Sequence, residues 1–85
     1  MKYLVSYDLN NPGQNYDCLI ACIQAYGSCA NINRSCWAIE THQTAAQIRN
    51  NLTQHLDSND TLFVCEIQSW ASLNLKKNTA ALLHN

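Results

Sequence analysis

Charged side chains are scarce in this sequence of 85 residues. Lys, Arg, Asp and Glu make up 13% of it, about half the usual share, and the formal net charge is −1. Only two of the five basic residues, Lys76 and Lys77, are adjacent. Because neutralising phosphates needs clustered Lys and Arg, strong unaided binding of nucleic acid is not expected. Asn and Gln are abundant instead, which predicts a polar, neutral surface that a partner partly covers.

Long apolar runs are also missing. No run reaches the length that crosses a membrane, and the apolar stretch at the start is too short for a secretory signal. We therefore expect a cytoplasmic protein without a membrane partner. The five cysteines, an odd number, are then expected to be reduced thiols.

No repeat or linker divides the chain, so residues 1–85 are expected to form a single domain, with about 69–85 as a C-terminal extension. A domain of this size buries a modest fraction of its surface and is marginally stable alone. A homodimer is therefore a reasonable expectation.

The hydrophobic pattern alternates between strand and helix periods along the chain. It predicts strands at 2–9, 28–32, 35–41 and 61–68, main helices at 14–26 and 44–56, and a short helix at 75–84. Residues 33 and 34 form the turn of a hairpin between the second and third strands.

Local signals support these boundaries. Residues 10–13, Asn-Asn-Pro-Gly, form a strong turn signal after the first strand, and residues 57–60 form a polar turn. Gly27 stands where a helix-ending glycine is expected, and Thr44 with Gln47 matches a capping box. Residues 36–39 are apolar on both faces, which indicates a strand covered on both sides.

This order predicts an α+β fold of the ferredoxin-like βαββαβ type with a short C-terminal helix. Right-handed crossovers would give a four-stranded antiparallel sheet with both main helices on one face. The other face would be bare. In the first strand Leu4 and Ser6 share a face with Asp8, and Val5 shares the opposite face with Tyr3 and Tyr7; both sets contain apolar groups. A homodimer packed through this open face is the simplest expectation.

Asp8 is the first candidate for a functional residue, because it ends the first strand and can lie at the rim of the sheet. If open faces pair around a twofold axis, the two Asp8 carboxylates could hold Mg²⁺, which could polarise a phosphate or activate water. The alternative is a solvated carboxylate that caps the following turn, and residue type alone favours that alternative.

The cysteines and tryptophans are weaker candidates. Cys29 and Cys36 could face each other across the hairpin, but no Cys-x-x-Cys pair or matched His supports zinc, and small buried thiols are the favoured interpretation. Trp37 is favoured as a core or interface residue over a base-stacking one. Trp70 is expected to pin the tail to the sheet edge, and Arg34 lies at the hairpin tip, where it could contact phosphate.

Several strings resemble a known family. LVSYDL at 4–9 and NRSCWAIE at 33–40 resemble the first strand and the hairpin motif of the small CRISPR-associated spacer-acquisition proteins of the endoribonuclease-like family. YDLNNPGQNY at 7–16, AQIR at 46–49 and WAS at 70–72 are closer to a stand-alone SinR-like branch of small bacterial and phage proteins. The resemblance covers almost the whole chain.

The resemblance implies a ferredoxin-like homodimer in which Asp8 lies near the dimer axis and binds a divalent metal for phosphodiester cleavage. Ser35 and Trp37 correspond to the serine and the aromatic residue of the hairpin motif. Nuclease members tend to carry arginines in the loop after the first strand and before the hairpin aromatic. Here that loop has no positive charge, and only Arg34 precedes Trp37, which weakens phosphate binding and charge stabilisation.

Three functions follow as hypotheses. The favoured one is a dimeric, non-catalytic binding or scaffold module with a protein partner, in bacterial or phage defence. The second is a ribonuclease or deoxyribonuclease that depends on a divalent metal and uses Asp8 from both subunits. The third is a small-ligand binder with its pocket between subunits.

Overall fold

A computed structural model describes residues 1–10 and 16–84 of the chain. The order of strands and helices is the predicted one, and each boundary lies within three residues of its prediction. The predicted turn at 10–13 falls largely outside the described residues. In chain order the elements are β1 (Lys2–Asp8), α1 (Asp17–Gln24), β2 (Cys29–Asn33), β3 (Cys36–Glu40), α2 (Ala45–Thr53), β4 (Thr61–Glu66) and α3 (Lys77–His84).

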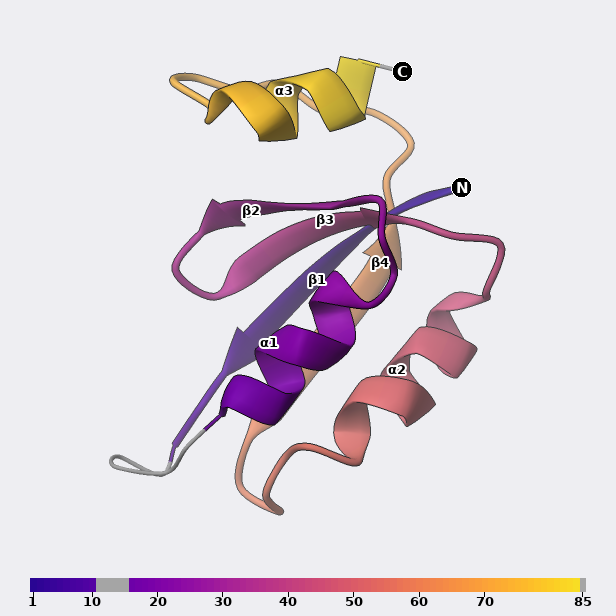
Figure 1. The fold of residues 1–85 in the computed structure, drawn as a ribbon, viewed down its shortest axis with the longest axis vertical. Helices are drawn as coiled ribbons and strands as arrows, with labels where there is room; N and C mark the ends of the chain where they lie inside the picture. The colour runs from indigo at the N-terminus through magenta and orange to yellow at the C-terminus, as the bar shows by residue number, and fades with distance from the viewer. Residues whose placement is uncertain (11–15, 85) are drawn as a thin grey trace.

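The four strands form one antiparallel sheet in the order β2-β3-β1-β4 (Figure 1). β1 therefore lies in the middle, between β3 and β4, and β2 and β4 are the edge strands. Val5 at the centre of β1 stands opposite Trp37 on β3 and Val64 on β4. The predicted α+β class with a four-stranded antiparallel sheet is confirmed.

The core lies between one face of this sheet and the helices α1 and α2. Alternate residues of β1, namely Tyr3, Val5 and Tyr7, are buried, because successive side chains of a strand point to opposite faces. They pack with side chains from β3 and from the apolar stripes of the two helices. These further members are Trp37, Ile39, Leu19, Ile23, Ile48 and Leu52.

Two local signals read from the sequence have the expected geometry. The Thr44 hydroxyl accepts a hydrogen bond from the Gln47 backbone N–H at 3.2 Å, and the Gln47 side chain accepts from the Thr44 N–H at 2.8 Å. This capping box begins α2. Gly27 follows α1 with φ +81°, a backbone conformation that side chains with a Cβ rarely adopt, so the chain leaves the helix there.

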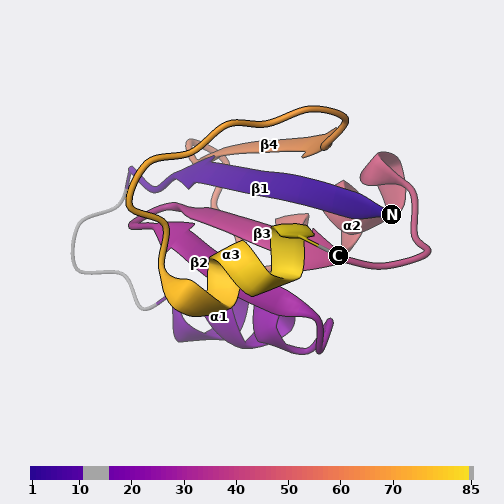
Figure 2. The same ribbon diagram turned by 90° about the horizontal axis from the view of Figure 1, so that it is seen from above.

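The opposite face of the sheet is not bare, and the prediction that it would be is wrong over β2 and β3. α3 packs on these two strands, on the side away from α1 and α2 (Figures 1 and 2). Ala30, Ala38 and Leu83 are buried there, and the buried Thr79 hydroxyl donates a hydrogen bond to the Asn31 carbonyl at 2.8 Å. The small alanines on the strands let the helix approach closely.

Residues 67–76, which we call the tail segment, connect β4 to α3. The segment leaves the end of β4 and passes along the sheet to the start of α3 (Figure 2). The tail segment does not cover the end of the sheet that contains Ser6, Asp8 and Phe63. These three residues are exposed or half-buried. The open face of the sheet, meaning the face away from α1 and α2, is therefore covered unevenly.

Candidate functional site

Asp8 is exposed at the end of β1, as predicted, and stands opposite Thr61 at the start of β4. It follows Tyr7, whose side chain is buried in the core, so Asp8 lies on the open face. Its carboxylate is therefore accessible from solvent at the end of the sheet that α3 does not cover.

The tip of the β2–β3 hairpin lies at the same end of the sheet as Asp8. The Tyr7 backbone N–H donates to the Ser35 carbonyl at 3.0 Å, one residue before Asp8. Arg34 is exposed beside Ser35 in the turn. The structure thus brings three of the residues singled out from the sequence, Asp8, Arg34 and Ser35, to one end of the sheet.

Trp37, the fourth of these residues, lies elsewhere. It is 9% exposed and faces the core, where its Nε1 donates to the Tyr7 hydroxyl at 3.2 Å. A buried indole with its N–H satisfied is a structural element of a core. In this position Trp37 has no face available for stacking on a base.

A hydrogen-bonded carboxylate that the sequence did not single out lies next to the Asp8 end. The Asp60 carboxylate accepts from the backbone N–H groups of Asn10 and Asp57, each at 2.8 Å, and from the Tyr16 hydroxyl at 2.9 Å. Partial desolvation raises the pKa of Asp60, but the three hydrogen bonds together outweigh it and lower the pKa. Asp60 joins the loop after β1 to the loop before β4.

The cysteines do not form the arrangement predicted across the hairpin. Cys29 pairs with Ile39, whereas Cys36 pairs with Asn33, so the two do not stand opposite each other. The reason is the position of the turn: with Cys29 opposite Ile39 and Asn31 opposite Trp37, Cys36 lies near the turn and Cys29 at the far end of the hairpin.

All five cysteines are free thiols. Burial raises the pKa of Cys22, Cys29 and Cys36, and for Cys36 the nearby Cys65 adds to the increase. For Cys22 a hydrogen bond with Asn51 works in the opposite direction. A raised pKa reduces the thiolate fraction at neutral pH, which makes these three thiols poor nucleophiles. Across residues 1–10 and 16–84, no three His, Cys, Asp or Glu side chains are grouped to hold a metal ion.

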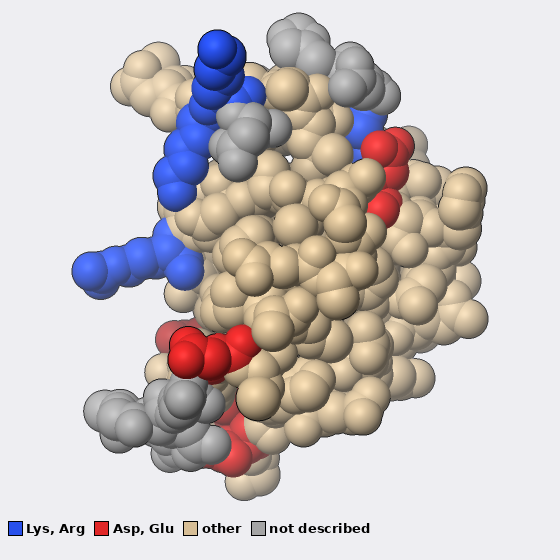
Figure 3. Space-filling view, viewed as in Figure 1, with Lys and Arg blue, Asp and Glu red and all other residues tan. Residues whose placement is uncertain are grey.

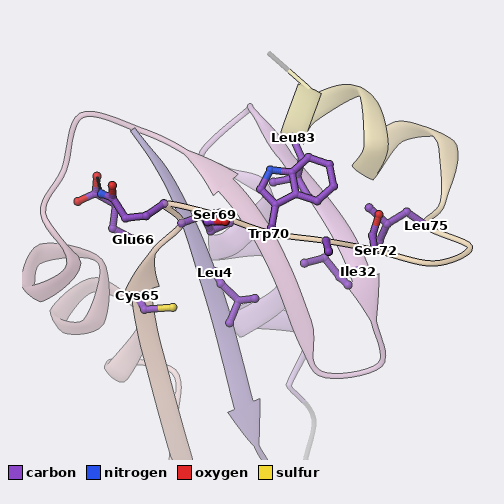
Figure 4. Close-up of a pocket in the computed structure, with 12 residues that line it drawn as sticks. Leu4, Ile32, Cys65, Glu66, Ser69, Trp70, Ser72, Leu75 and Leu83 are labelled. Carbon is purple, nitrogen blue, oxygen red and sulfur yellow. Dashed lines mark hydrogen bonds between the residues drawn. The ribbon is translucent and has the colours of Figure 1, made fainter.

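A cavity lies under the tail segment, on the open face. Its volume is about 530 Å³, and we call it the tail pocket. Leu4 and Cys65 rise into it from the neighbouring strands β1 and β4, while Leu83 of α3 and Trp70 of the tail segment stand above them (Figure 4). The wall is therefore built from three parts of the chain that are distant in sequence.

Polar groups of the tail pocket come from the end of β4 and from the tail segment. Glu66, Gln68, Ser69 and Ser72 line it, and the Gln68 side-chain amide donates to the Glu66 carboxylate at 2.9 Å. Trp70 was expected at the sheet edge, and no sequence pattern predicted this pocket. The spacing of Leu75, Thr79 and Leu83 is the signal that the tail packs on the sheet, because these residues share one helical face.

Charged side chains lie around the margin of the face shown in Figure 3, with Lys and Arg toward one end and Asp and Glu mostly toward the other. The broad centre of this face carries uncharged side chains. Such a distribution offers no continuous basic stripe on this face for a nucleic-acid backbone to follow.

No helix within residues 1–10 and 16–84 combines the length and apolar character needed to span a membrane. We compared the chain with protein-family models and with curated proteins, and neither comparison returned a match.

Proposed function

We propose that the protein is a small, non-catalytic binding or scaffold module that works as a homodimer in the cytoplasm. We further propose that its fold is of the ferredoxin-like βαββαβ type, extended by α3. The alternation of elements and the strand order β2-β3-β1-β4 support this assignment, since both agree with that topology.

The observation that carries the binding role is Phe63. Its side chain is 59% exposed on β4, an edge strand, at the end of the open face beyond the tail segment. From Thr61 to Cys65 the strand has no charged residue, although charges are the usual protection of an exposed edge. An exposed aromatic ring on an unprotected edge favours a surface that a protein partner covers.

The resemblance to CRISPR-associated spacer-acquisition proteins supports a role in bacterial or phage defence. The small number of basic residues supports a scaffold more than a nuclease, because a nuclease must hold the phosphate backbone and stabilise developing charge. This role implies protein partners. The first of them is the second copy of the chain in the homodimer.

Light scattering tests the dimer. At micromolar concentration we expect a mass of twice 9.6 kDa for the unaltered protein. Phe63→Glu should produce monomers with an unchanged circular dichroism spectrum, because the ring is exposed within one subunit. Leu73→Glu, at a residue that is 86% exposed in the tail segment, is the matched control and should leave the dimer intact. A monomer of the unaltered protein would contradict the proposal.

A second candidate function is supported by the clustering of Asp8, Arg34 and Ser35 at one end of the sheet. In this proposal Asp8 carboxylates from two copies hold Mg²⁺, whose preferred ligands are oxygens, and Arg34 contacts a phosphate. The metal would polarise the scissile phosphodiester.

Incubating the protein with RNA and DNA in Mg²⁺ or Mn²⁺ tests this second candidate. Cleavage by the unaltered protein that Asp8→Ala abolishes would favour the nuclease over the scaffold. Cleavage that survives Asp8→Ala would show that Asp8 is not the metal ligand, and a lack of cleavage in every condition would favour the scaffold. Asp17→Ala, at an exposed aspartate that begins α1, is the matched control.

A further inference from the structure

We propose that the tail pocket binds a small, uncharged and largely apolar molecule. The inference is independent of the dimer, because every wall of the pocket comes from a single subunit. Its volume of about 530 Å³ lies within the range of sites that take small organic ligands.

The apolar part of the pocket favours a ligand with a ring. Leu4, Ile32, Leu75 and Leu83 line it from β1, β2, the tail segment and α3, and the Trp70 indole lies among them (Figure 4). Trp70 lines the pocket and is 41% exposed, so it keeps surface that a ligand could cover. Burying aromatic and aliphatic surface of this size is the main source of affinity in such sites.

The polar part of the pocket selects against anions. Among the described residues of the lining, Glu66 is the single charged one, and its carboxylate accepts a hydrogen bond from Gln68. Figure 4 shows this carboxylate directed away from Leu4 and Leu83. Lys76 follows the lining residue Leu75 in sequence, but Lys76 itself is not part of the lining. Its Nζ donates a hydrogen bond to the Asn31 side chain at 2.7 Å. An acidic ligand would therefore find no cation among the described lining residues to compensate its charge. Ser69 and Ser72 offer hydroxyls that can bind an uncharged polar group.

Two fluorescent probes with the same ring system test this proposal. N-phenyl-1-naphthylamine is uncharged, and 8-anilinonaphthalene-1-sulfonate carries a sulfonate. Both emit more strongly in apolar surroundings. We expect saturable binding of the uncharged probe, with an affinity at least about threefold higher than that of the sulfonate, because the described lining has no cation to offset the cost of desolvating the sulfonate. Absence of saturable binding, or tighter binding of the sulfonate, would overturn the proposal.

Two variants place the binding in the tail pocket. Trp70→Ala removes the aromatic wall and should lower the affinity for N-phenyl-1-naphthylamine about tenfold. Ser72→Trp adds a bulky side chain at an exposed position of the lining and should block binding without disturbing the core. Leu73→Ser is the matched control, since Leu73 lies in the same segment but outside the lining, and it should bind as the unaltered protein does. Unchanged affinity in both pocket variants would refute the assignment.

Alkylation of cysteines gives a readout resolved by residue. Cys65 lies in the floor of the tail pocket, whereas Cys18 is exposed on α1. Saturating N-phenyl-1-naphthylamine should slow the reaction of Cys65 with iodoacetamide, measured by mass spectrometry of peptides, and leave Cys18 unaffected. Equal rates for Cys65 with and without the probe would place the probe elsewhere and contradict the proposal.

Discussion

On the face of the sheet that α1 and α2 cover, alternate strand residues such as Val5 and Ile39 are completely buried beneath the two helices. On the opposite face α3 covers β2 and β3, while Phe63 on β4 is 59% exposed. The first face has a cluster of fully buried side chains with smaller hollows of about 260 and 330 Å³ at its margin, and the second has a cavity of about 530 Å³ and an open end. The face under α1 and α2, which we call the core face, therefore stabilises the fold. The open face keeps exposed surface that is available for binding.

The largest expected effect separates the two faces directly. Leu52 is fully buried on α2, and Leu83 lies on α3 at the other face. We expect Leu52→Ala to lower the free energy of unfolding by about 3 kcal/mol, because a cavity adds to the lost burial. Leu83→Ala should lower the free energy of unfolding by about 2 kcal/mol. The loss is smaller because Leu83 has packing neighbours on one side only, so the substitution uncovers fewer of them. Urea titration followed by circular dichroism measures both, and equal losses would contradict the difference between the faces.

A smaller effect tests how α3 is attached to the open face. Thr79→Val keeps the shape of the side chain but removes the hydroxyl of the buried Thr79, which donates to the Asn31 carbonyl. We expect a loss of about 1 to 2 kcal/mol in unfolding free energy. Hydrogen exchange should speed up in α3 more than in α2. Thr61→Val, at an exposed residue of β4, is the control and should change stability by less than about 0.5 kcal/mol. Faster exchange in both helices alike would show that α3 is not a separate unit.

The attachment of α2 on the core face has its own local test. Thr44→Ala removes one half of the capping box and should lower stability by about 1 kcal/mol. Thr44→Ser keeps the accepting oxygen and should retain most of that stability. Thermal unfolding compares the two variants, and identical melting temperatures would show that the cap does not contribute.

The smallest expected effect is a pH dependence at the edge of the core face, where Asp60 ties Tyr16 to the loops. Because the pKa of Asp60 is lower in the folded protein than its usual 3.8, the carboxylate stabilises the fold above that value. This contribution is lost as the pH falls through the folded pKa.

Asp60→Asn should therefore reduce stability at pH 7 and flatten its decline below about pH 4. The midpoint of urea unfolding, measured from pH 7 down to pH 2, checks this expectation. Asp17→Asn, at the exposed start of α1, is the comparison variant. A parallel decline in Asp60→Asn and the unaltered protein would show that Asp60 does not contribute to the acid sensitivity.

The core face was predictable because its signals are local. The helical spacing of Leu19 and Ile23, the capping box at Thr44 and the alternation along β1 each reflect the geometry of one element. Boundaries shifted by one to three residues, since the ends of helices and strands depend on tertiary contacts. The order of elements then restricted the sheet to few arrangements.

The cover on the open face was missed although the sequence contained a sign of it. Residues 36–39 are apolar on both faces, and that pattern predicted a strand covered on both sides. The covering element is α3, which lies far along the chain, and no local pattern says which strands a distant helix will contact. The same limitation hid the tail pocket, because its walls meet only after α3 has packed on β2.

The candidate site residues were predictable in position more than in role. Asp8 was expected at an exposed strand end and Arg34 at a hairpin tip, and both lie there. Trp37 was expected in a core or an interface, and it lies in the core. The Asp60 network was not foreseen, because it joins two loops that are separated by 50 residues in sequence, as the bond to Asn10 shows.

The central place of β1 has a consequence for how the chain acquires its structure during synthesis. β1 is made first, yet its two neighbours are β3 and β4, and Tyr3 pairs with both Ile39 and Glu66. The sheet cannot close on both sides of β1 until β4 has left the ribosome. Pairings between such distant segments form slowly. We therefore expect the nascent chain to expose one edge of β1 until β4 has emerged, which leaves this edge open to chaperones.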